Sequence, residues 1–345
     1  MFTKGQAIDF IDKVFGKGVS SNQGLNHSVV CPICKSKNAN KTSFTADAYN
    51  KRKLVVRTDN FVCHCWVCGY KSRNLAHLIK SYHSEWLTEY LKQFVGQKII
   101  LADLPDSLKT PFPSVLTLPE GFVTFFQGLE DRNWSPDKSP IIPSLKYLVK
   151  RFNGDEKKAY EAAVFWGLGI TNKDLGLKDR IIMPSFDGTG DLNYYAARAI
   201  DQASFPKYKN PSVPREDIIF NELNIDWTQA LTIVEGPFDL LKCNYNATCL
   251  LGSELTTEYL LFLRIIQHET PVILALDPDA RSKALKIADS LHSYGNEIKI
   301  LDIPRQYKDV GEMNRDDFIH ELNNAKIYDK SYSLRDRVAN MLGTK

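Results

Sequence analysis

Carboxylates follow short apolar runs at three places in the second half of the chain, and carboxylates that converge can support metal-dependent chemistry. Two of them, LTIV and VILAL, have the apolar and β-branched residues of buried strands, and EIKIL predicts a third strand. The acidic residues that follow them are Glu235 and Asp239, Asp277 and Asp279, and Asp309 and Glu312. A single residue such as Asp239 or Asp279 is equally well explained as a helix cap or a first-turn residue.

Several carboxylates at one place repel one another unless cations lie between them. Carboxylate oxygens are the ligands that Mg²⁺ and Mn²⁺ prefer, and these ions keep water ligands and bridge to substrate phosphates. Two such ions can activate an attacking hydroxyl and stabilise the leaving group in phosphoryl transfer. The acidic residues therefore predict a catalytic site for Mg²⁺ or Mn²⁺, with two ions expected.

The elements that must position these acids alternate between strand and helix. Helical patterns, TEYLLFLRIIQ and an alanine-rich stretch after Asp279, separate the apolar runs. Alternation of this kind predicts a parallel α/β sheet, in which functional groups gather at the carboxyl ends of the strands. We therefore expect all three acidic clusters at one edge of one sheet.

Basic residues gather upstream of this region. DRIIMPSFDGTGDLNYYAARAI has two apolar runs around a turn at residues 187–190, which predicts a β-hairpin, and a proline-bounded loop, FPKYKNP, follows it. We predict a basic ridge that holds a phosphate backbone, with ordinary surface charge as the alternative. The ridge residues are Arg180, Arg198, Lys207 and Lys209, with Tyr208 and Asn210 beside them.

Five of the seven cysteines fall between Cys31 and Cys68, which indicates metal binding rather than a disulfide framework. CPIC and CHCWVCG supply two Cys-x-x-Cys pairs, the spacing of a tetrahedral zinc site on a small antiparallel sheet. This zinc ribbon should depend on its structural zinc to fold. The predicted ligands are Cys31, Cys34, Cys65 and Cys68, with His64 or Cys63 replacing one of them as the alternative.

Charge separates this first segment from the rest of the chain. Residues 1–85 hold 13 Lys and Arg against 5 Asp and Glu, whereas the remainder holds 31 against 36. Basic and aromatic side chains alternate around the cysteines, a mixture suited to single-stranded nucleic acid. The alternative is a purely structural zinc site. The residues concerned are Lys51, Arg52, Lys53, Arg57, Lys71 and Arg73, with Tyr49, Phe61, Trp66 and Tyr70.

Length and composition bound the domain organisation. A chain of 345 residues, 43% hydrophobic, is long enough for two or three domains. It has no apolar run of membrane-spanning length, and the start, MFTKGQAIDFIDKVFGKG, has acidic residues where a secretory signal stays apolar, so we expect a cytoplasmic protein without membrane contact. Helical spacing over 73–97 is followed by a proline-rich stretch, which predicts a linker over 98–139 and a second folded unit from about 140.

VEGPFD followed by ALDPDA resembles the signature of the Toprim fold, a glutamate after the first strand and an Asp-x-Asp after a later one. The order CPIC, KTSFTAD, CHCWVCG, the hairpin, FPKYKNP and then Toprim is similar to that of DnaG-type primases, especially the compact primases of tailed bacteriophages. The resemblance covers roughly residues 25–315. It implies a zinc-binding domain over 1–97, a first part of the polymerase core over 140–230, a Toprim domain over 231–315, and a C-terminal helix and tail over 316–345.

The resemblance implies a DNA primase that makes short RNA primers from nucleoside triphosphates on single-stranded DNA. Glu235 would bind metal or act in acid–base chemistry, Asp277 and Asp279 would bind metal, and Asp239 and Asp309 would be accessory acids. The basic ridge would hold template or nucleotide. A replicative helicase and a single-strand-binding protein would be partners; no helicase motif and no helicase-docking domain is recognised in the chain. If phage-encoded, the protein would work in the host cytoplasm.

Departures from the family pattern and two rival functions accompany this hypothesis. The first pair is Cys-x-x-Cys where DnaG has a histidine, the usual Asp-Gly-Asp is Asp-Pro-Asp, and Gly311 falls where a further aspartate is common, with Glu312 as a substitute. The rivals are a Toprim metal-dependent nuclease and a non-catalytic zinc-ribbon nucleic-acid-binding protein. A nuclease would cleave DNA without nucleoside triphosphates.

Overall fold

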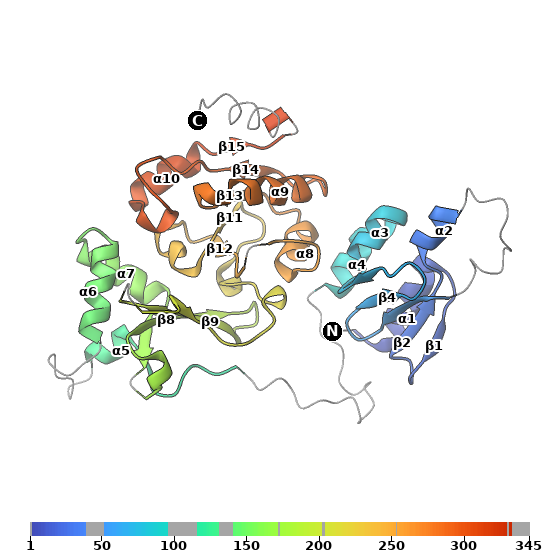
Figure 1. The fold of residues 1–345 in the computed structure, drawn as a ribbon, viewed down its shortest axis with the longest axis horizontal. Helices are drawn as coiled ribbons and strands as arrows, with labels where there is room; N and C mark the ends of the chain where they lie inside the picture. Colours follow the sequence, from blue (N-terminus) through green and yellow to red (C-terminus); the bar gives the residue numbers. More distant parts are fainter. Residues whose placement is uncertain are drawn as a thin grey trace. The chain divides into compact units, whose positions relative to one another are not determined.

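The computed structural model describes residues 2–38, 52–95, 116–130, 141–171, 173–201, 204–252, 254–329 and 331–332. The chain divides into two units, Met1–Ser114 with Thr256–Gln267, and Val115–Leu255 with His268–Lys345 (Figure 1). No helix within the described residues has the length and apolar character needed to cross a membrane.

The first unit is built on an antiparallel sheet of five strands in the order β1-β2-β3-β4-β5. Its core is aromatic: Phe94 lies 4.9 Å, between ring centroids, from both Phe10 and Phe61, so helices α1 and α4 pack together against the loop that precedes β4. The small antiparallel sheet predicted to carry the cysteines is confirmed. The elements are α1 (Lys4–Phe15), β1 (Val19–Ser21), β2 (Asn26–Val29), α2 (Pro32–Asn38), β3 (Leu54–Arg57), β4 (Cys63–Cys65), β5 (Lys71–Ser72), α3 (Ala76–Tyr82), η2 (Ser84–Trp86) and α4 (Leu87–Phe94).

A segment distant in sequence completes the first unit. Thr256–Gln267, which contains α8 (Leu260–Gln267), belongs to this unit although we expected it in the α/β domain. Glu258 of that segment accepts hydrogen bonds from Ser72 Oγ at 2.7 Å and from the Arg73 backbone amide at 2.5 Å. Long-range pairing of this kind is not visible in local sequence patterns.

The second unit begins with an antiparallel sheet in the order β10-β9-β8-β7-β6. The predicted hairpin is confirmed, since β8 and β9 pair along their length across the turn at residues 187–190. The linker prediction is wrong for residues 122–130, because β6 pairs with β7 and so extends this sheet; residues 98–115 and 131–139 lie outside the described residues. The elements are β6 (Phe122–Thr124), α5 (Phe125–Glu130), α6 (Ile141–Arg151), α7 (Glu156–Phe165), β7 (Gly169–Thr171), η5 (Leu175–Leu177), β8 (Arg180–Phe186), β9 (Leu192–Ala199) and β10 (Tyr208–Lys209).

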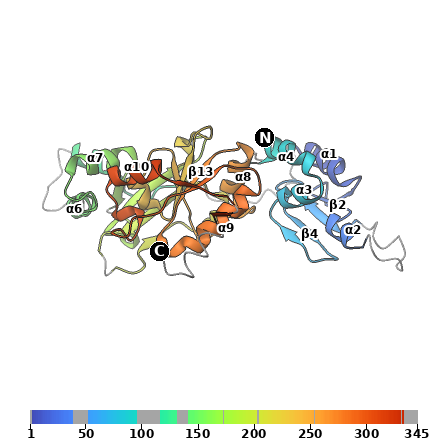
Figure 2. The same ribbon diagram turned by 90° about the horizontal axis from the view of Figure 1, so that it is seen from above.

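The second sheet of this unit is the predicted α/β sheet, in the order β12-β11-β13-β14-β15. The first four strands pair in parallel, and β15, which falls in the segment predicted to be a helix and tail, adds antiparallel to β14. Figures 1 and 2 show α9 and α10 on opposite sides of this sheet. The elements are η6 (Arg215–Asp217), η7 (Glu222–Asn224), β11 (Leu231–Val234), η8 (Pro237–Lys242), β12 (Ala247–Cys249), β13 (Val272–Ala275), η9 (Pro278–Ala280), α9 (Arg281–His292), β14 (Ile298–Ile300), η10 (Val310–Glu312), α10 (Arg315–Asn323) and β15 (Lys326–Ile327).

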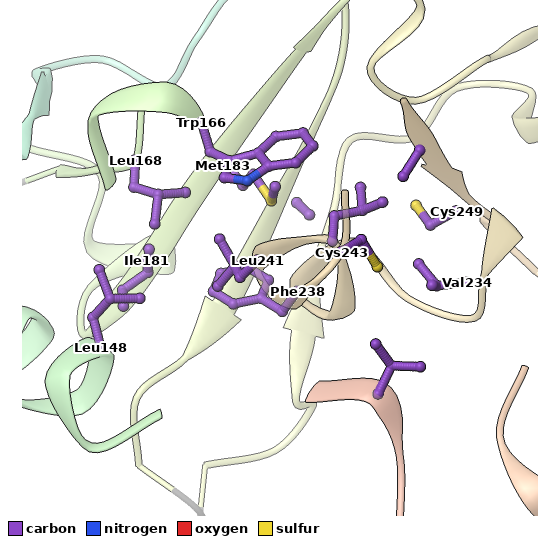
Figure 3. Close-up of a cluster of buried hydrophobic side chains, with 14 of the residues drawn as sticks. Leu148, Trp166, Leu168, Ile181, Met183, Val234, Phe238, Leu241, Cys243 and Cys249 are labelled. Atoms are coloured by element: carbon purple, nitrogen blue, oxygen red, sulfur yellow. The ribbon is translucent and has the colours of Figure 1, made fainter. Parts of the chain in front are cut away.

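One hydrophobic core joins the two sheets of the second unit (Figure 3). Ile181 and Met183 of β8 belong to the same cluster as Phe238 and Leu241 of η8. Phe238 is fully buried and Leu241 is 3% exposed. Burying each of these side chains stabilises the fold by about 1.5–3 kcal/mol, so η8 is held firmly between the sheets. The acidic residue that η8 carries is therefore fixed relative to both sheets.

Candidate active site

Strand register brings the first two acids to the same edge of the parallel sheet. Val234 of β11 pairs with Ala275 of β13, so Glu235 and Asp277 leave the sheet one and two residues later at the same end. Both strands are buried along their whole length, as expected for parallel strands covered on both faces. The prediction that these acids meet at one edge is confirmed.

Three carboxylates come close enough to share a cation. Glu235, Asp277 and Asp279 each offer an oxygen atom, and these atoms lie within 4.8 Å of one another. Lys283 Nζ, from α9, lies 3.3 Å from Glu235 Oε1. The second oxygen, Glu235 Oε2, and Asp277 Oδ1 are both buried without a hydrogen-bond partner in the part of the chain that the structure describes. Buried carboxylate oxygens left unpaired beside a third carboxylate fit a hard divalent cation such as Mg²⁺ or Mn²⁺.

Two further acids approach this group from short 3₁₀ helices. Asp239 of η8 accepts a hydrogen bond at Oδ2 from the Gly236 backbone amide, at 2.9 Å. Asp309 precedes η10 and accepts one at Oδ1 from the Glu312 amide, at 2.9 Å. Their carboxylates meet at Gly311: a Cβ placed there would lie 2.7 Å from Asp239 Oδ1 and 3.1 Å from Asp309 Oδ1.

Burial and the repulsion between these carboxylates raise the pKa of two of them, Asp277 and Asp239. Burial, and after it the negative charges of Asp239, Glu235, Asp309 and Asp279, together raise the pKa of Asp277 to about 7. Burial also raises the pKa of Asp239 to about 6, with a contribution from Asp309. Buried carboxylates that repel one another are typical of catalytic and metal sites.

A basic groove of about 1180 Å³ opens beside the acidic cluster. Helix α6, strand β9 and the β9–β10 loop supply its cations, while Asp309, Gly311 and Glu312 also line it. A groove that combines cations with an acidic metal site suits a polyphosphate or a nucleic-acid backbone. Its basic residues are Lys146, Lys150, Arg151, Arg198 and Lys207, and the three from α6 were not among the predicted site residues.

Arg198 lines the groove, and its positive charge opposes the rise in the pKa of Asp239. Its Nε donates to Tyr147 Oη at 2.7 Å and its Nη1 donates to Tyr208 Oη at 2.8 Å. The guanidinium also lies 5.4 Å from the Tyr208 ring centroid and 5.3 Å from that of Phe238. Burial raises the pKa of Tyr208 to about 12, so this hydroxyl stays protonated and accepts from the arginine. Arg198 is thereby held in one orientation at the wall of the groove.

The remaining ridge residues divide into buried and exposed ones. The expectation that Arg180 lies on an exposed ridge is wrong: the side chain is buried and donates to the carbonyls of Ala197, Pro206 and Lys207 at 3.3, 2.7 and 3.2 Å. It therefore supports the loop that carries Lys207. Asn210 is exposed and its Oδ1 accepts from the Ala197 amide at 3.3 Å.

The predicted zinc ligands converge in the first unit. Cys31, Cys34, Cys65 and Cys68 lie with their sulfurs within 4.8 Å of one another, at 3.9 Å for Cys31–Cys68 and 3.7 Å for Cys34–Cys65. A tetrahedron with Zn–S bonds of about 2.3 Å places sulfurs about 3.8 Å apart, so the cage fits zinc. Gly69 follows with φ at +74°, a backbone conformation that favours glycine.

The alternative ligand Cys63 lies outside this cluster. It is 2% exposed and pairs across the sheet with Ser72. Burial raises the pKa of its thiol to about 12, so it stays protonated. Cys63 is a core residue, although it shares a face of β4 with Cys65 as the alternation predicts.

The basic and aromatic residues around the zinc site do not all face solvent. Phe61 is 3% exposed and belongs to the aromatic core, and Arg57 forms an ion pair with Asp59. Trp66 is 70% exposed, with its ring 4.3 Å from that of His64, and is available for stacking. Tyr49 and Lys51, together with KTSFTAD, lie outside the described residues.

Comparisons with known proteins point to primases. No family model matches the chain. A DNA primase of Mycoplasma genitalium is 23% identical over 310 residues, which cover 75% of this chain and 51% of that protein, so the chain spans about half the length of this curated relative.

Two solved structures are also similar to the chain. A DnaG primase catalytic domain bound to single-stranded DNA has a TM-score of 0.45 at 18% identity, covering 58% of this chain and 75% of that one. The Aquifex aeolicus primase, with its zinc-binding and RNA polymerase domains, has a TM-score of 0.41 at 16% identity, covering 95% and 87%. The curated relative is a DNA primase, which agrees with the resemblance to primases that the motifs predict.

Proposed function

We propose that this chain is a DNA primase that joins ribonucleotides into short RNA primers on a single-stranded DNA template. The observation that carries the proposal is a pair of buried oxygens beside a basic groove, Glu235 Oε2 and Asp277 Oδ1, which have no hydrogen-bond partner within the described ranges. A phosphoryl-transfer enzyme needs divalent metal and a polyanion site side by side. The similarity to a primase of Mycoplasma genitalium supports this reaction over others that use the same acids.

Glu235, Asp277 and Asp279 would hold Mg²⁺ or Mn²⁺, which when bound activates a hydroxyl nucleophile and stabilises negative charge on the transferred phosphate. The groove cations attract the template strand or the triphosphate of the incoming nucleotide. Arg198, already held by two tyrosine hydroxyls, loses little further rotamer freedom when it contacts a phosphate. Tyr147 and Tyr208 thus orient the Arg198 side chain for binding a phosphate group.

The zinc-binding unit would contact the template. Trp66 is exposed beside the second cysteine pair, and Arg52, Lys53 and Lys71 supply positive charge on the same unit. Stacking of a base on an aromatic ring is worth about 1–3 kcal/mol per base, without strong sequence preference. A replicative helicase and a single-strand-binding protein are proposed as partners by resemblance.

The decisive experiment measures labelled ribonucleotide incorporation on single-stranded DNA with Mg²⁺ and all four ribonucleoside triphosphates. Glu235→Gln and Asp277→Asn should each abolish template-dependent RNA synthesis. The matched control is Glu297→Gln, which removes the same charge at the amino end of β14, away from the acidic edge. This control should synthesise RNA at the rate of the unaltered protein.

Other outcomes would replace the proposal. DNA cleavage that needs Glu235 but no nucleoside triphosphate would identify a nuclease. If the protein binds DNA but neither synthesises RNA nor cleaves DNA, even with a replicative helicase added, it would be identified as a non-catalytic nucleic-acid-binding protein.

A further inference from the structure

The acidic edge has a cation of its own where further acid was expected. An added Cβ at Gly311 would lie 2.4 Å from Arg151 Nη2, closer than real side-chain contacts allow, and 2.7 Å from Asp239 Oδ1. A side chain at position 311 therefore has no room while Arg151 holds its place. The arginine guanidinium and the carboxylates of Asp239 and Asp309 surround the same point.

Arg151 is anchored through its backbone, whereas its guanidinium is held weakly by hydrogen bonds. Lys242 Nζ donates to the Arg151 carbonyl at 2.5 Å and so secures the last turn of α6. Nη2 reaches the carbonyls of Phe238 and Gly311 only at 3.3 and 3.5 Å, and Nη1 reaches Tyr147 Oη at 3.5 Å. Nε is buried and has no hydrogen-bond partner among the residues that the structure describes. Contacts this long contribute little, whereas the guanidinium lies near enough to Asp239 for its charge to oppose the rise in the pKa of that carboxyl.

The five acids thus form two groups with different partners. In the first group, Glu235 and Asp277 each have a buried oxygen without a partner among the described residues. In the second, Asp239 and Asp309 each accept a backbone amide and face the Arg151 guanidinium, whose charge opposes the rise in the pKa of Asp239. Among the described residues, unsatisfied carboxylate oxygens that indicate a missing ligand occur in the first group and not in the second.

We propose that Arg151 takes the place of a second divalent ion, so that this chain binds one metal ion at Glu235, Asp277 and Asp279 and neutralises Asp239 and Asp309 with a guanidinium. The inference rests on the metal site of the proposed function, but not on the reaction performed there. It departs from the expectation of two ions, because position 311, where the resemblance implies a further aspartate, is a glycine and offers no carboxylate.

Metal stoichiometry tests the inference without any activity assay. Mn²⁺ binding to the zinc-loaded full chain, without nucleotide or DNA, would be measured by the electron paramagnetic resonance signal of the free ion. The unaltered protein should bind one Mn²⁺ tightly. Arg151→Met should create a second site, with affinity at least about tenfold higher than any second binding event in the unaltered protein, because Asp239 and Asp309 lose their counter-charge. Adding Asp239→Asn to Arg151→Met should remove this second site.

Two matched variants separate this role from a general effect of positive charge. Lys150→Met removes a neighbouring cation of α6 that lines the groove but does not lie at Gly311, and it should leave one tight Mn²⁺. Arg151→Lys keeps the charge and should also bind one. Circular dichroism confirms that each variant is folded.

Several results would overturn the inference. Tight binding of two Mn²⁺ ions by the unaltered protein would overturn it, and this result does not depend on whether Arg151→Met folds. An equal gain in Lys150→Met and Arg151→Met would reduce the effect to the general field of the groove. No tight Mn²⁺ at all would refute the metal site itself, whereas a failure to synthesise RNA with one ion bound would refute only the proposed reaction.

Discussion

Replacing Asp277 by asparagine should stabilise the metal-free protein while it destroys the metal site. Burial and neighbouring carboxylates raise the pKa of Asp277 from its usual 3.8 to about 7. The folded protein therefore binds this proton more tightly than the unfolded chain does, and its stability falls as pH rises through this range. At pH 8 the carboxylate is ionised and its full cost is present, whereas asparagine carries no charge at any pH.

The size of the effect follows from the shift. A shift of one pKa unit corresponds to about 1.4 kcal/mol, so a shift of about three units sets an upper bound near 4 kcal/mol. Because Asp277 is partly exposed, solvent screening reduces the expected gain to about 1–2 kcal/mol. For a unit of this size that gain raises the melting temperature by about 3–6 °C at pH 8. At pH 5 the gain should fall to about two-fifths, since the folded carboxyl is then protonated while the unfolded one still ionises.

The assay is thermal unfolding of the zinc-loaded protein at pH 8 and pH 5, without and then with Mg²⁺. Mg²⁺ at ten times its dissociation constant should stabilise the unaltered protein by about 1.4 kcal/mol and leave Asp277→Asn unchanged. Glu297→Gln, an exposed acid away from the site, should show neither effect. A destabilised Asp277→Asn at pH 8, or an equal gain at both pH values, would show that the charge of Asp277 does not cost the metal-free fold stability.

Cys68→Ser should lose zinc and unfold the first unit, because a structural zinc site supplies about 10 kcal/mol or more of binding energy. Cys63→Ser should keep one zinc per chain, as measured by atomic absorption. Equal zinc loss in both variants would contradict the ligand set. Arg198→Lys should weaken the binding of single-stranded DNA by about three- to tenfold, measured by fluorescence anisotropy, because the guanidinium held by two tyrosines is lost. The dependence of the binding constant on salt concentration should not change, because the positive charge is kept. Unaltered affinity would remove Arg198 from the interface. Lys283→Met should tighten Mn²⁺ binding several-fold, because Glu235 Oε1 no longer pairs with an ammonium group; weaker binding would show that Lys283 supports the metal site instead.

Features that depend on neighbours in sequence were predictable. Glu235 and Asp277 follow buried parallel strands directly, and the carboxyl ends of such strands meet at one edge. The cysteine pairs lie within single tight turns, so their spacing alone indicates a zinc cage. In both cases a local pattern determines where the side chain emerges, and the remaining geometry follows from how strands pair.

Features that depend on packing between distant segments required the tertiary structure. The sequence marks Arg180 and Arg198 alike as basic residues of a hairpin, yet one is buried against carbonyls and the other lines the groove. Cys63 shares a strand face with Cys65, but only cross-strand pairing with Ser72 places it in the core. Sequence composition describes the charge of a side chain and not the surface that comes to cover it.

The position of Arg151 beside the acids depends entirely on tertiary packing. This arginine lies on a helix that is 84 residues from Glu235 in sequence, and no local pattern connects it to the acids. The core between the two sheets and the bond from Lys242 bring the end of α6 to the acidic edge. Sequence alone therefore specified which acids lie at the ends of the strands, whereas tertiary packing decided which cations face them, because a long basic side chain can reach whichever carboxylates the fold brings within its range.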